Sequence, residues 1–243
     1  MSLYQQKNIE LRPEGRKPFD ARSLFDSYGY PHRNTPYLSQ IPCSWGAVYF
    51  PEHWREFHSF LILRFSEAWI SLEEHIVPHI RSNKWKKSWK KYFIELVHLR
   101  GYAMLYPNYN DFVSLSTNHL EMGSHVKDEP KHIYDRKKQL FTLPLMTIPE
   151  VNEGEIHATG LLDIPDEHLP VWSDLPVLDL LGGVSSEQEI EERGQARQNE
   201  LAHCETRGSL VSQRRAFAAS ELFTCVEEDI HSETMDYHVD YGF

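Results

Sequence analysis

The stretch FVSLSTNHLEMGSH, residues 112–125, ends a hydrophobic run with side chains that are able to carry out acid–base chemistry. His119 and Glu121 are two residues apart, so on an extended strand their side chains point to the same side. A neighbouring carboxylate orients an imidazole ring and helps it to accept a proton. We therefore expect His119 to act as a catalytic base and Glu121 as the partner that orients it.

Three polar residues precede this pair and extend the same prediction. The hydroxyls of Ser116 and Thr117 are suited to binding a hydroxyl or phosphate oxygen, and the Asn118 amide is suited to donating to a developing charge. Such a set fits transfer to, or hydrolysis of, a polar hydroxylated substrate. The alternative is a polar turn at the end of a strand, in which the same side chains bond to nearby backbone.

A metal site is a further alternative for this stretch. His125 lies four residues after Glu121, so two histidines and one carboxylate resemble the ligand set of a non-haem iron site. A distant ligand could be His132, His157 or His168. Because the chain has 14 histidines, such a pattern arises readily by chance. We assign no metal ligands, and the cofactor stays unknown.

The segment NKWKKSWKK, residues 83–91, is the second candidate because it contains five lysines. On a helix, Lys86 would stack with Lys90 and Lys87 with Lys91 at a spacing of four residues. Such a cluster suits a phosphate, a nucleotide, an anionic lipid or an acidic partner. The alternatives are a solvated basic face above a row of tryptophans, or pairing with the acidic C-terminal part of the chain.

The charge of the chain is divided unevenly. Residues 1–149 carry a net charge of +5 and residues 150–243 a net charge of −16, which gives −11 for all 243 residues. We find no helix-turn-helix, zinc-finger spacing or RNA-binding strand motif, so we expect no sequence-specific DNA binding. The three cysteines are far apart, and no run of about 18 apolar residues could span a membrane. The polar N-terminus has no signal-peptide pattern, so the expected location is cytoplasmic.

The periodicity of the sequence predicts an α+β fold in which two long amphipathic helices pack on a small antiparallel hairpin or sheet, with extended arms. The first helix should run from Pro51 towards Pro78, and its apolar stripe comprises Trp54, Phe57, Leu61, Phe65, Ala68, Leu72 and Ile76. The second should begin after Ser82 or Asn83 and end at Gly101. The runs 102–107 and 112–116 should then form the hairpin.

The chain divides into five expected parts. Residues 1–47 read as an extended, partly ordered arm, and residues 48–146 as the core of helices and hairpin, with a further possible strand at 140–146. Residues 147–183 read as a proline-rich docking segment that buries Trp172, Leu175, Val177, Leu178 and Leu180. A polar helix, capped by Ser186 and Glu189, should occupy 184–204. Residues 205–243 read as an acidic, mostly disordered tail.

The run from GAVYFPEHWREFHSFL to NYNDFVSLSTNHLE, residues 46 to about 125, resembles a segment of uncharacterised proteins of filamentous fungi. The resemblance implies an association with biosynthetic gene clusters or with glycosyl transfer. It assigns no catalytic residue.

Two functions follow from these patterns. The first is an auxiliary enzyme of a fungal-type biosynthetic pathway, secondary-metabolite or glycan, with transferase-like acid–base chemistry on a small polar or anionic substrate. Its residues would be His119 and Glu121, with Ser116, Thr117, Asn118, Lys86, Lys87, Lys90 and Lys91 in binding roles. The second is a non-catalytic interaction module whose basic helix binds an anionic protein partner or a membrane surface.

Overall fold

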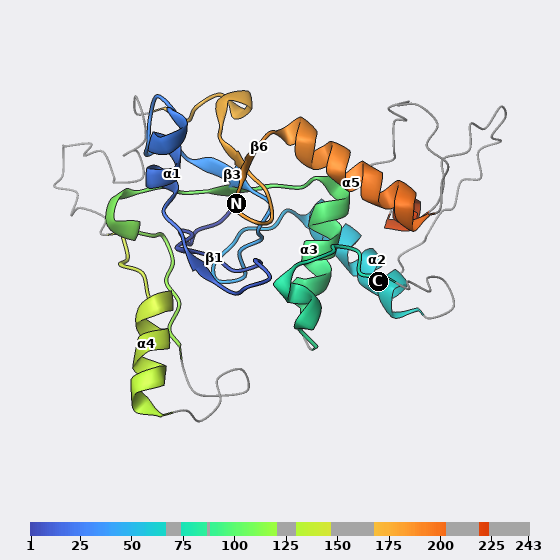
Figure 1. Ribbon diagram of the computed structural model, residues 1–243, viewed down its shortest axis with the longest axis horizontal. Coiled ribbons are helices and arrows are strands. Elements are labelled where there is room, and N and C mark those ends of the chain that lie inside the picture. The colour runs from blue at the N-terminus through green and yellow to red at the C-terminus, as the bar shows by residue number, and fades with distance from the viewer. Residues whose placement is uncertain (67–73, 87, 121–129, 147–167, 203–218, 224–243) are drawn as a thin grey trace, which may run out of the picture.

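The computed structural model describes residues 1–66, 74–86, 88–120, 130–146, 168–202 and 219–223. It has mixed α+β architecture, which confirms the predicted fold class (Figure 1). The helices lie at Ala21–Tyr28 (α1), Pro51–Phe65 (α2), Trp89–Arg100 (α3), Lys131–Phe141 (α4) and Glu187–Leu201 (α5). The strands are Asn8–Ile9 (β1), Lys17–Pro18 (β2), Tyr37–Ser39 (β3), Met104–Tyr106 (β4), Val177–Leu178 (β5) and Val184–Ser185 (β6).

A small mixed sheet with the order β4-β3-β5-β6 lies between α1 and the group formed by α2, α3 and α5 (Figure 1). Strand β3 pairs antiparallel with β4 and parallel with β5. Every residue of β3 is buried, as expected for a strand covered on both faces. The predicted partner of the 102–107 run is therefore wrong: β4 pairs with β3, whereas Ser114 makes an isolated parallel bridge with Leu145.

The first 47 residues belong to the folded core, so the expected extended arm is wrong. Leu11, Phe25, Tyr37 and Leu38 are completely buried. The chain start is also paired, because Ser2 forms a bridge with Ala47. The apolar residues of this segment follow no single period because they come from very short strands, one helix and the turns between them. Periodicity therefore missed their burial.

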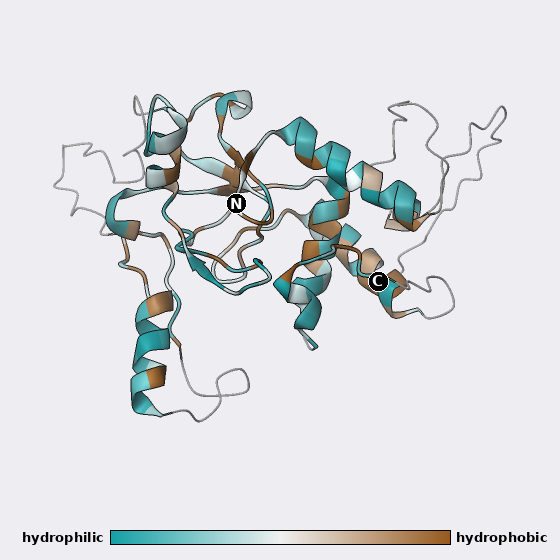
Figure 2. Ribbon diagram, in the orientation of Figure 1, coloured by the Kyte–Doolittle hydropathy of each residue, from teal (hydrophilic) through white to brown (hydrophobic). Residues whose placement is uncertain are grey.

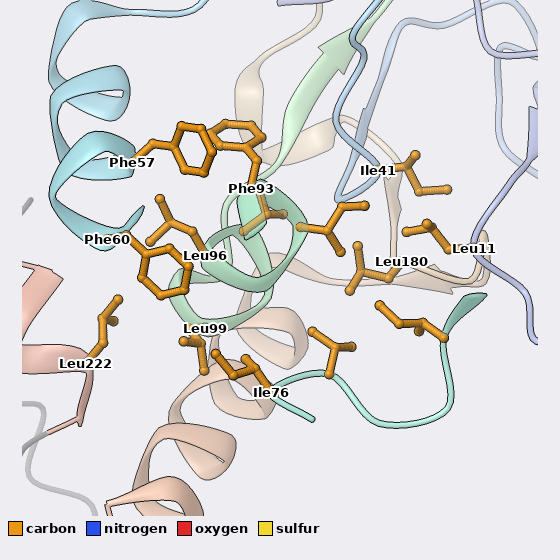
Figure 3. Close-up of a cluster of buried hydrophobic side chains, with 14 of the residues drawn as sticks. Leu11, Ile41, Phe57, Phe60, Ile76, Phe93, Leu96, Leu99, Leu180 and Leu222 are labelled. Atoms are coloured by element: carbon orange, nitrogen blue, oxygen red, sulfur yellow. The ribbon is translucent and has the colours of Figure 1, made fainter. Parts of the chain in front are cut away.

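Helix α2 is shorter than predicted, and only part of its predicted apolar stripe is buried. It starts at Pro51 as expected and ends at Phe65, where Ser66 is extended. Phe57 and Phe60 point into the core together with residues of α3, as Figure 3 shows, whereas Trp54 and Phe65 are exposed. The buried Ile76 and Val77 reach the same core from non-helical backbone. Positions 68 and 72 of the predicted stripe lie outside the described residues.

Helix α3 begins later than predicted and ends as predicted. Ser88 precedes its first turn, and a short 3₁₀ helix occupies Arg81–Lys84. Gly101 adopts a left-handed conformation (φ 67°), and its N–H bonds to the carbonyls of His98 and Val97. Because Lys86 precedes the helix, the predicted helical stacking of Lys86 with Lys90 is wrong.

The C-terminal third follows the sequence prediction in part. The capping box of Ser186 and Glu189 starts α5, as expected. Leu175, Val177, Leu178 and Leu180 are buried as predicted, but Trp172 is 52% exposed and donates from its indole to Glu187. The possible strand at 140–146 is instead the end of α4 and an isolated bridge at Leu145. Within the acidic tail, the described residues Ala219–Phe223 form a short 3₁₀ helix, and Phe223 stacks on Phe60 of α2.

Helices α3 and α5 approach closely where α3 ends. A Cβ atom on Gly194 of α5 would lie 2.4 Å from the carbonyl oxygen of His98, and one on Gly101 would lie 2.9 Å from the Cα of Glu191. Gln198 of α5 donates from its side chain to the carbonyl oxygen of Leu99. Helix α5 therefore satisfies the carbonyl of Leu99 at the end of α3, which no further helical turn could pair.

We predict that Gly194→Ala destabilises the fold. Alanine would gain about 1 kcal/mol from helix propensity, but its methyl group meets fixed backbone, and such overpacking costs about 1–3 kcal/mol or more. Urea unfolding should show a net loss of stability. Glu192→Ala, on the exposed face of α5, is the control and should change the free energy of unfolding by less than about 0.5 kcal/mol. Equal stability of the two variants would contradict the close contact.

A pH effect should arise at the same contact. Burial, with the charges of Arg193 and Arg197 adding and Glu200 opposing, lowers the pKa of His98 from 6.5 to about 4. In that interval the unfolded chain binds a proton that the folded chain does not, so stability falls as the pH drops from 6.5 towards 4. The loss is at most about 3 kcal/mol. His98→Gln should show a smaller fall in unfolding free energy over this range than the unsubstituted protein, and parallel curves would refute the assignment.

Candidate functional site

The predicted catalytic pair is only partly described. His119 is exposed, near the end of the described segment 88–120. Glu121 lies outside the described residues, as does His125, the second imidazole of the metal alternative. The roles of His119 and Glu121 therefore stay predictions.

The hydroxyls that were expected to hold substrate are bonded to backbone. Ser116 Oγ donates to the carbonyl of Trp45 over 3.1 Å. Thr117 Oγ1 donates to the carbonyl of Leu143 and accepts from its N–H, each over 2.8 Å. The carbonyl of Asn118 accepts from the hydroxyl of Thr142 over 3.2 Å. These contacts fasten residues 116–118 to neighbouring segments, which is the polar-turn alternative considered from the sequence.

The predicted lysines do not form one cluster. Lys86 is exposed, whereas Lys90 forms an ion pair with Glu10, and both side chains are largely buried. The ammonium of Lys91 lies 5.6 Å from the centroid of the Tyr92 ring, as in a cation–π contact. Lys87 lies outside the described residues.

Cations from several segments line a different site, which we call the basic groove. It consists of two adjoining hollows that share Lys7: one is lined also by Arg16, Glu10 and Lys90, and the other by Arg136, Lys137, Gln139 and Leu140 of α4. Helix α4 projects from the rest of the molecule, and most of its length is hydrophilic (Figure 2). The groove therefore brings the start of the chain, the residue before β2 and α3 together with a protruding basic helix.

Aromatic side chains form the floor of the groove beneath Arg16. The guanidinium carbon of Arg16 lies 4.9 Å from the centroid of Phe141. Phe141 packs edge-on against Trp45 at 4.8 Å, and Trp45 packs against Tyr4 at 5.3 Å. Burial raises the pKa of the Tyr4 phenol, which stays neutral and donates to the Phe141 carbonyl over 2.8 Å. A row of rings that pack edge to face thus supports the Arg16 side chain.

The groove carries an excess of positive charge. Among the described residues, the lining contains five cations and one carboxylate, Glu10, which is paired with Lys90. Within the described ranges, no carboxylate lies at ion-pair distance from Lys7, Arg16 or Arg136. Burial lowers the pKa of Arg16, Glu10 opposes this shift, and Arg81 adds to it. A bound carboxylate or phosphate would therefore find donors whose charge is not already neutralised.

The shape of the groove favours an extended ligand over a small enclosed one. The hollow beside Lys90 has a volume of about 40 Å³, whereas pockets for small ligands usually reach at least about 300 Å³. The hollow along α4 is open to solvent. The free thiol of Cys43 lines the smaller hollow but is buried, and its sulfur accepts from the N–H of Trp45.

Sequence reasoning missed this site because its cations are distant along the chain. Lys7, Arg16 and Arg136 fall in three segments that show no common pattern. The run DRKK at residues 135–138 was the one signal of a basic site, but its sequence does not distinguish a binding surface from an ordinary charged stretch. The described part of the chain contains no cluster of three or more metal-ligating side chains that could hold an ion, and none of its helices is long and apolar enough to cross a bilayer.

Comparison with known proteins gives one similarity. A family model described as the SPBC1E8.03c C-terminal domain, named for a protein of S. pombe, matches residues 16–70, less than a quarter of the chain. The matched region runs from Arg16 of the groove to the end of α2 and beyond. No curated protein and no solved structure matches the chain.

We predict that Thr117→Val destabilises the fold because it removes both hydrogen bonds to the buried Leu143. The expected loss is about 1–2 kcal/mol in the free energy of unfolding, measured by urea denaturation. Thr142→Val removes one longer hydrogen bond between the same two segments and is the graded control, with a smaller loss. An unchanged stability of Thr117→Val would contradict the fastening role and would leave its hydroxyl available to a ligand.

Proposed function

We propose that this chain is an interaction module that binds an acidic segment of a partner protein in the basic groove. The observation that supports this most is the convergence of Lys7, Arg16 and Arg136 on one groove without ion-pair partners among the described residues. The proposal corresponds to the second function expected from the sequence. Its cations, however, come from α4 and the N-terminal segment rather than from residues 83–91.

The chemistry of the groove suits a carboxylate-rich peptide that also carries an apolar side chain. Arg16 offers a planar fork that can bind a carboxylate with two parallel hydrogen bonds. Leu140 and the aliphatic stem of Lys7 offer apolar contact beside these charges. Complementary charge accelerates association and selects acidic over basic partners, while the apolar contact slows dissociation.

The enzymatic function is supported less by the described contacts. Two of its proposed substrate-binding hydroxyls, Ser116 and Thr117, are engaged with backbone. Acid–base chemistry by His119 and Glu121 stays a prediction. An association with fungal biosynthetic or glycosyl-transfer proteins, implied by the resemblance of residues 46–125, would suit a module that recruits an enzyme, and we retain it with the cytoplasmic location as part of the proposal.

The test is a titration of the full chain with a fluorescein-labelled peptide of alternating glutamate and phenylalanine, followed by anisotropy. We expect saturable binding that weakens as salt rises from low to physiological concentration. Arg136→Gln and Lys7→Gln should each raise the dissociation constant by about two- to five-fold, in line with up to about 1 kcal/mol per exposed charge.

Lys138→Gln is the matched control, because Lys138 is an exposed cation on α4 that does not line the groove. It should leave the affinity nearly unchanged. A peptide with lysine in place of glutamate should not bind. Equal effects of Arg136→Gln and Lys138→Gln would show that net charge alone governs binding and would refute a specific groove.

A further inference from the structure

A second surface, on α2 and α3, carries four large aromatic side chains in two contacting pairs; three of them are exposed, and Tyr92 is half-buried. We call Trp54, Phe65, Trp89 and Tyr92 the aromatic ridge. The rings of Trp54 and Trp89 are 5.8 Å apart, and those of Phe65 and Tyr92 are 5.0 Å apart. The two pairs lie along neighbouring helices, and Trp89 and Tyr92 are one helical turn apart on α3.

The ridge is unusually exposed for residues of this size. Trp54 is 45%, Trp89 43% and Phe65 64% accessible to solvent. Tryptophan and phenylalanine are normally among the most buried side chains, and contiguous exposed apolar surface marks sites of protein or membrane contact. The inner neighbours Phe57 and Phe93 are buried in the core beside these rings (Figure 3).

Two cations contact the ridge, and two more lie just before α3 in the chain. The ammonium of Lys91 and the guanidinium of Arg64 lie 5.6 Å and 5.8 Å from the ring of Tyr92. Lys84 and Lys86, both exposed, precede α3. Arg64 is neutralised by the buried Glu95, whereas Lys84, Lys86 and Lys91 have no ion-pair partner within the described residues. The ridge therefore combines exposed rings with Lys91, and the exposed Lys84 and Lys86 lie just before α3 in the chain.

We propose that the aromatic ridge binds the surface of an anionic lipid bilayer. Tryptophan and tyrosine rings prefer the boundary between headgroups and acyl chains, because they are apolar with one polar group. Each lysine near the membrane adds attraction to phosphatidylserine or phosphoinositide headgroups, and its long stem lets the ammonium stay hydrated. No part of the chain needs to span the bilayer for this contact.

The residue types distinguish a membrane from a protein partner here. Lysine is depleted from protein–protein interfaces, where arginine is preferred, yet all three unpaired cations at the ridge are lysines. The ridge shares no residue with the described lining of the basic groove, although Lys90, which lines the groove, lies between Trp89 and Lys91 on α3. The proposal therefore does not depend on the proposed function, and the two can fail separately.

The test is co-sedimentation of the full chain with vesicles of phosphatidylcholine that contain about a third of phosphatidylserine, compared with vesicles of phosphatidylcholine alone. We expect partition to the anionic vesicles and at least about ten-fold weaker partition to the neutral ones. Trp54→Ala combined with Trp89→Ala should reduce partition to the anionic vesicles by at least about ten-fold, because the apolar contact is lost. Trp172→Ala is the control, since Trp172 is at least as exposed as Trp54 and Trp89 but lies outside the ridge, and this variant should partition as the unsubstituted protein does.

Trp54 also contacts Phe57 and Phe93 of the core, so its substitution could weaken the fold. A second variant that keeps the rings separates this effect from a loss of lipid binding. Lys86→Gln combined with Lys91→Gln keeps the rings and should lower partition to the anionic vesicles by several-fold. Three results would overturn the proposal: no partition of the unsubstituted protein, no change in either double variant, or a loss caused only by Lys7→Gln and Arg136→Gln. The last result would assign lipid binding to the groove.

Discussion

Two ion pairs between α2 and α3 fix the arrangement on which both proposed surfaces depend. Arg100 donates to Glu56 over 2.7 Å, and Tyr102 donates to the second oxygen of the same carboxylate over 2.7 Å. Arg64 donates to Glu95 over 2.8 Å. The side chain of Glu56 is completely buried and that of Glu95 nearly so. Loss of one partner would leave an uncompensated charge in the core, which typically costs about 3–5 kcal/mol.

These two ion pairs fix how α2 and α3 lie against each other, and they therefore determine which side chains of α3 face the groove and which face the ridge. They place Trp89 beside Trp54 on the outer face and turn Lys90, the next residue, towards Glu10 at the groove. The opposite end of α3 is closed by Gly101 and by the side chain of Gln198 from α5. Helix α3, which is buried on one face, thus connects the ring-lined basic groove with the aromatic ridge, and backbone groups at its C-terminal end are satisfied by Gly101 and Gln198.

The parts of the fold that the sequence predicted are those set by local chemistry. Ser186 and Glu189 cap the first turn of α5 through hydrogen bonds within four residues, so the start of this helix was recognisable. Gly101 ends α3 through its own left-handed conformation, so the end of that helix was recognisable too. The pairing of β4 with β3 was not recognisable, because strands of three residues carry almost no periodic signal and their partners are set by tertiary contacts. The hydrogen bonds of Thr117 with Leu143 are likewise tertiary contacts, so the sequence did not show that this hydroxyl is bonded to backbone. The groove cations escaped prediction because only the folded chain brings Lys7 to Arg136.

The most direct test of the account is NMR mapping of an acidic peptide on the isotope-labelled full chain. If the basic groove is the binding site, titration with the glutamate–phenylalanine peptide should shift the side-chain signals of Arg16 and the indole signal of Trp45, together with backbone amides of Lys7 and of α4 from Arg136 to Leu140. The signals of His119 and of the neighbouring Ser116 and Thr117 should not move. Shifts centred on His119, with the groove signals unchanged, would contradict the account and restore the region after Leu115 as the functional site.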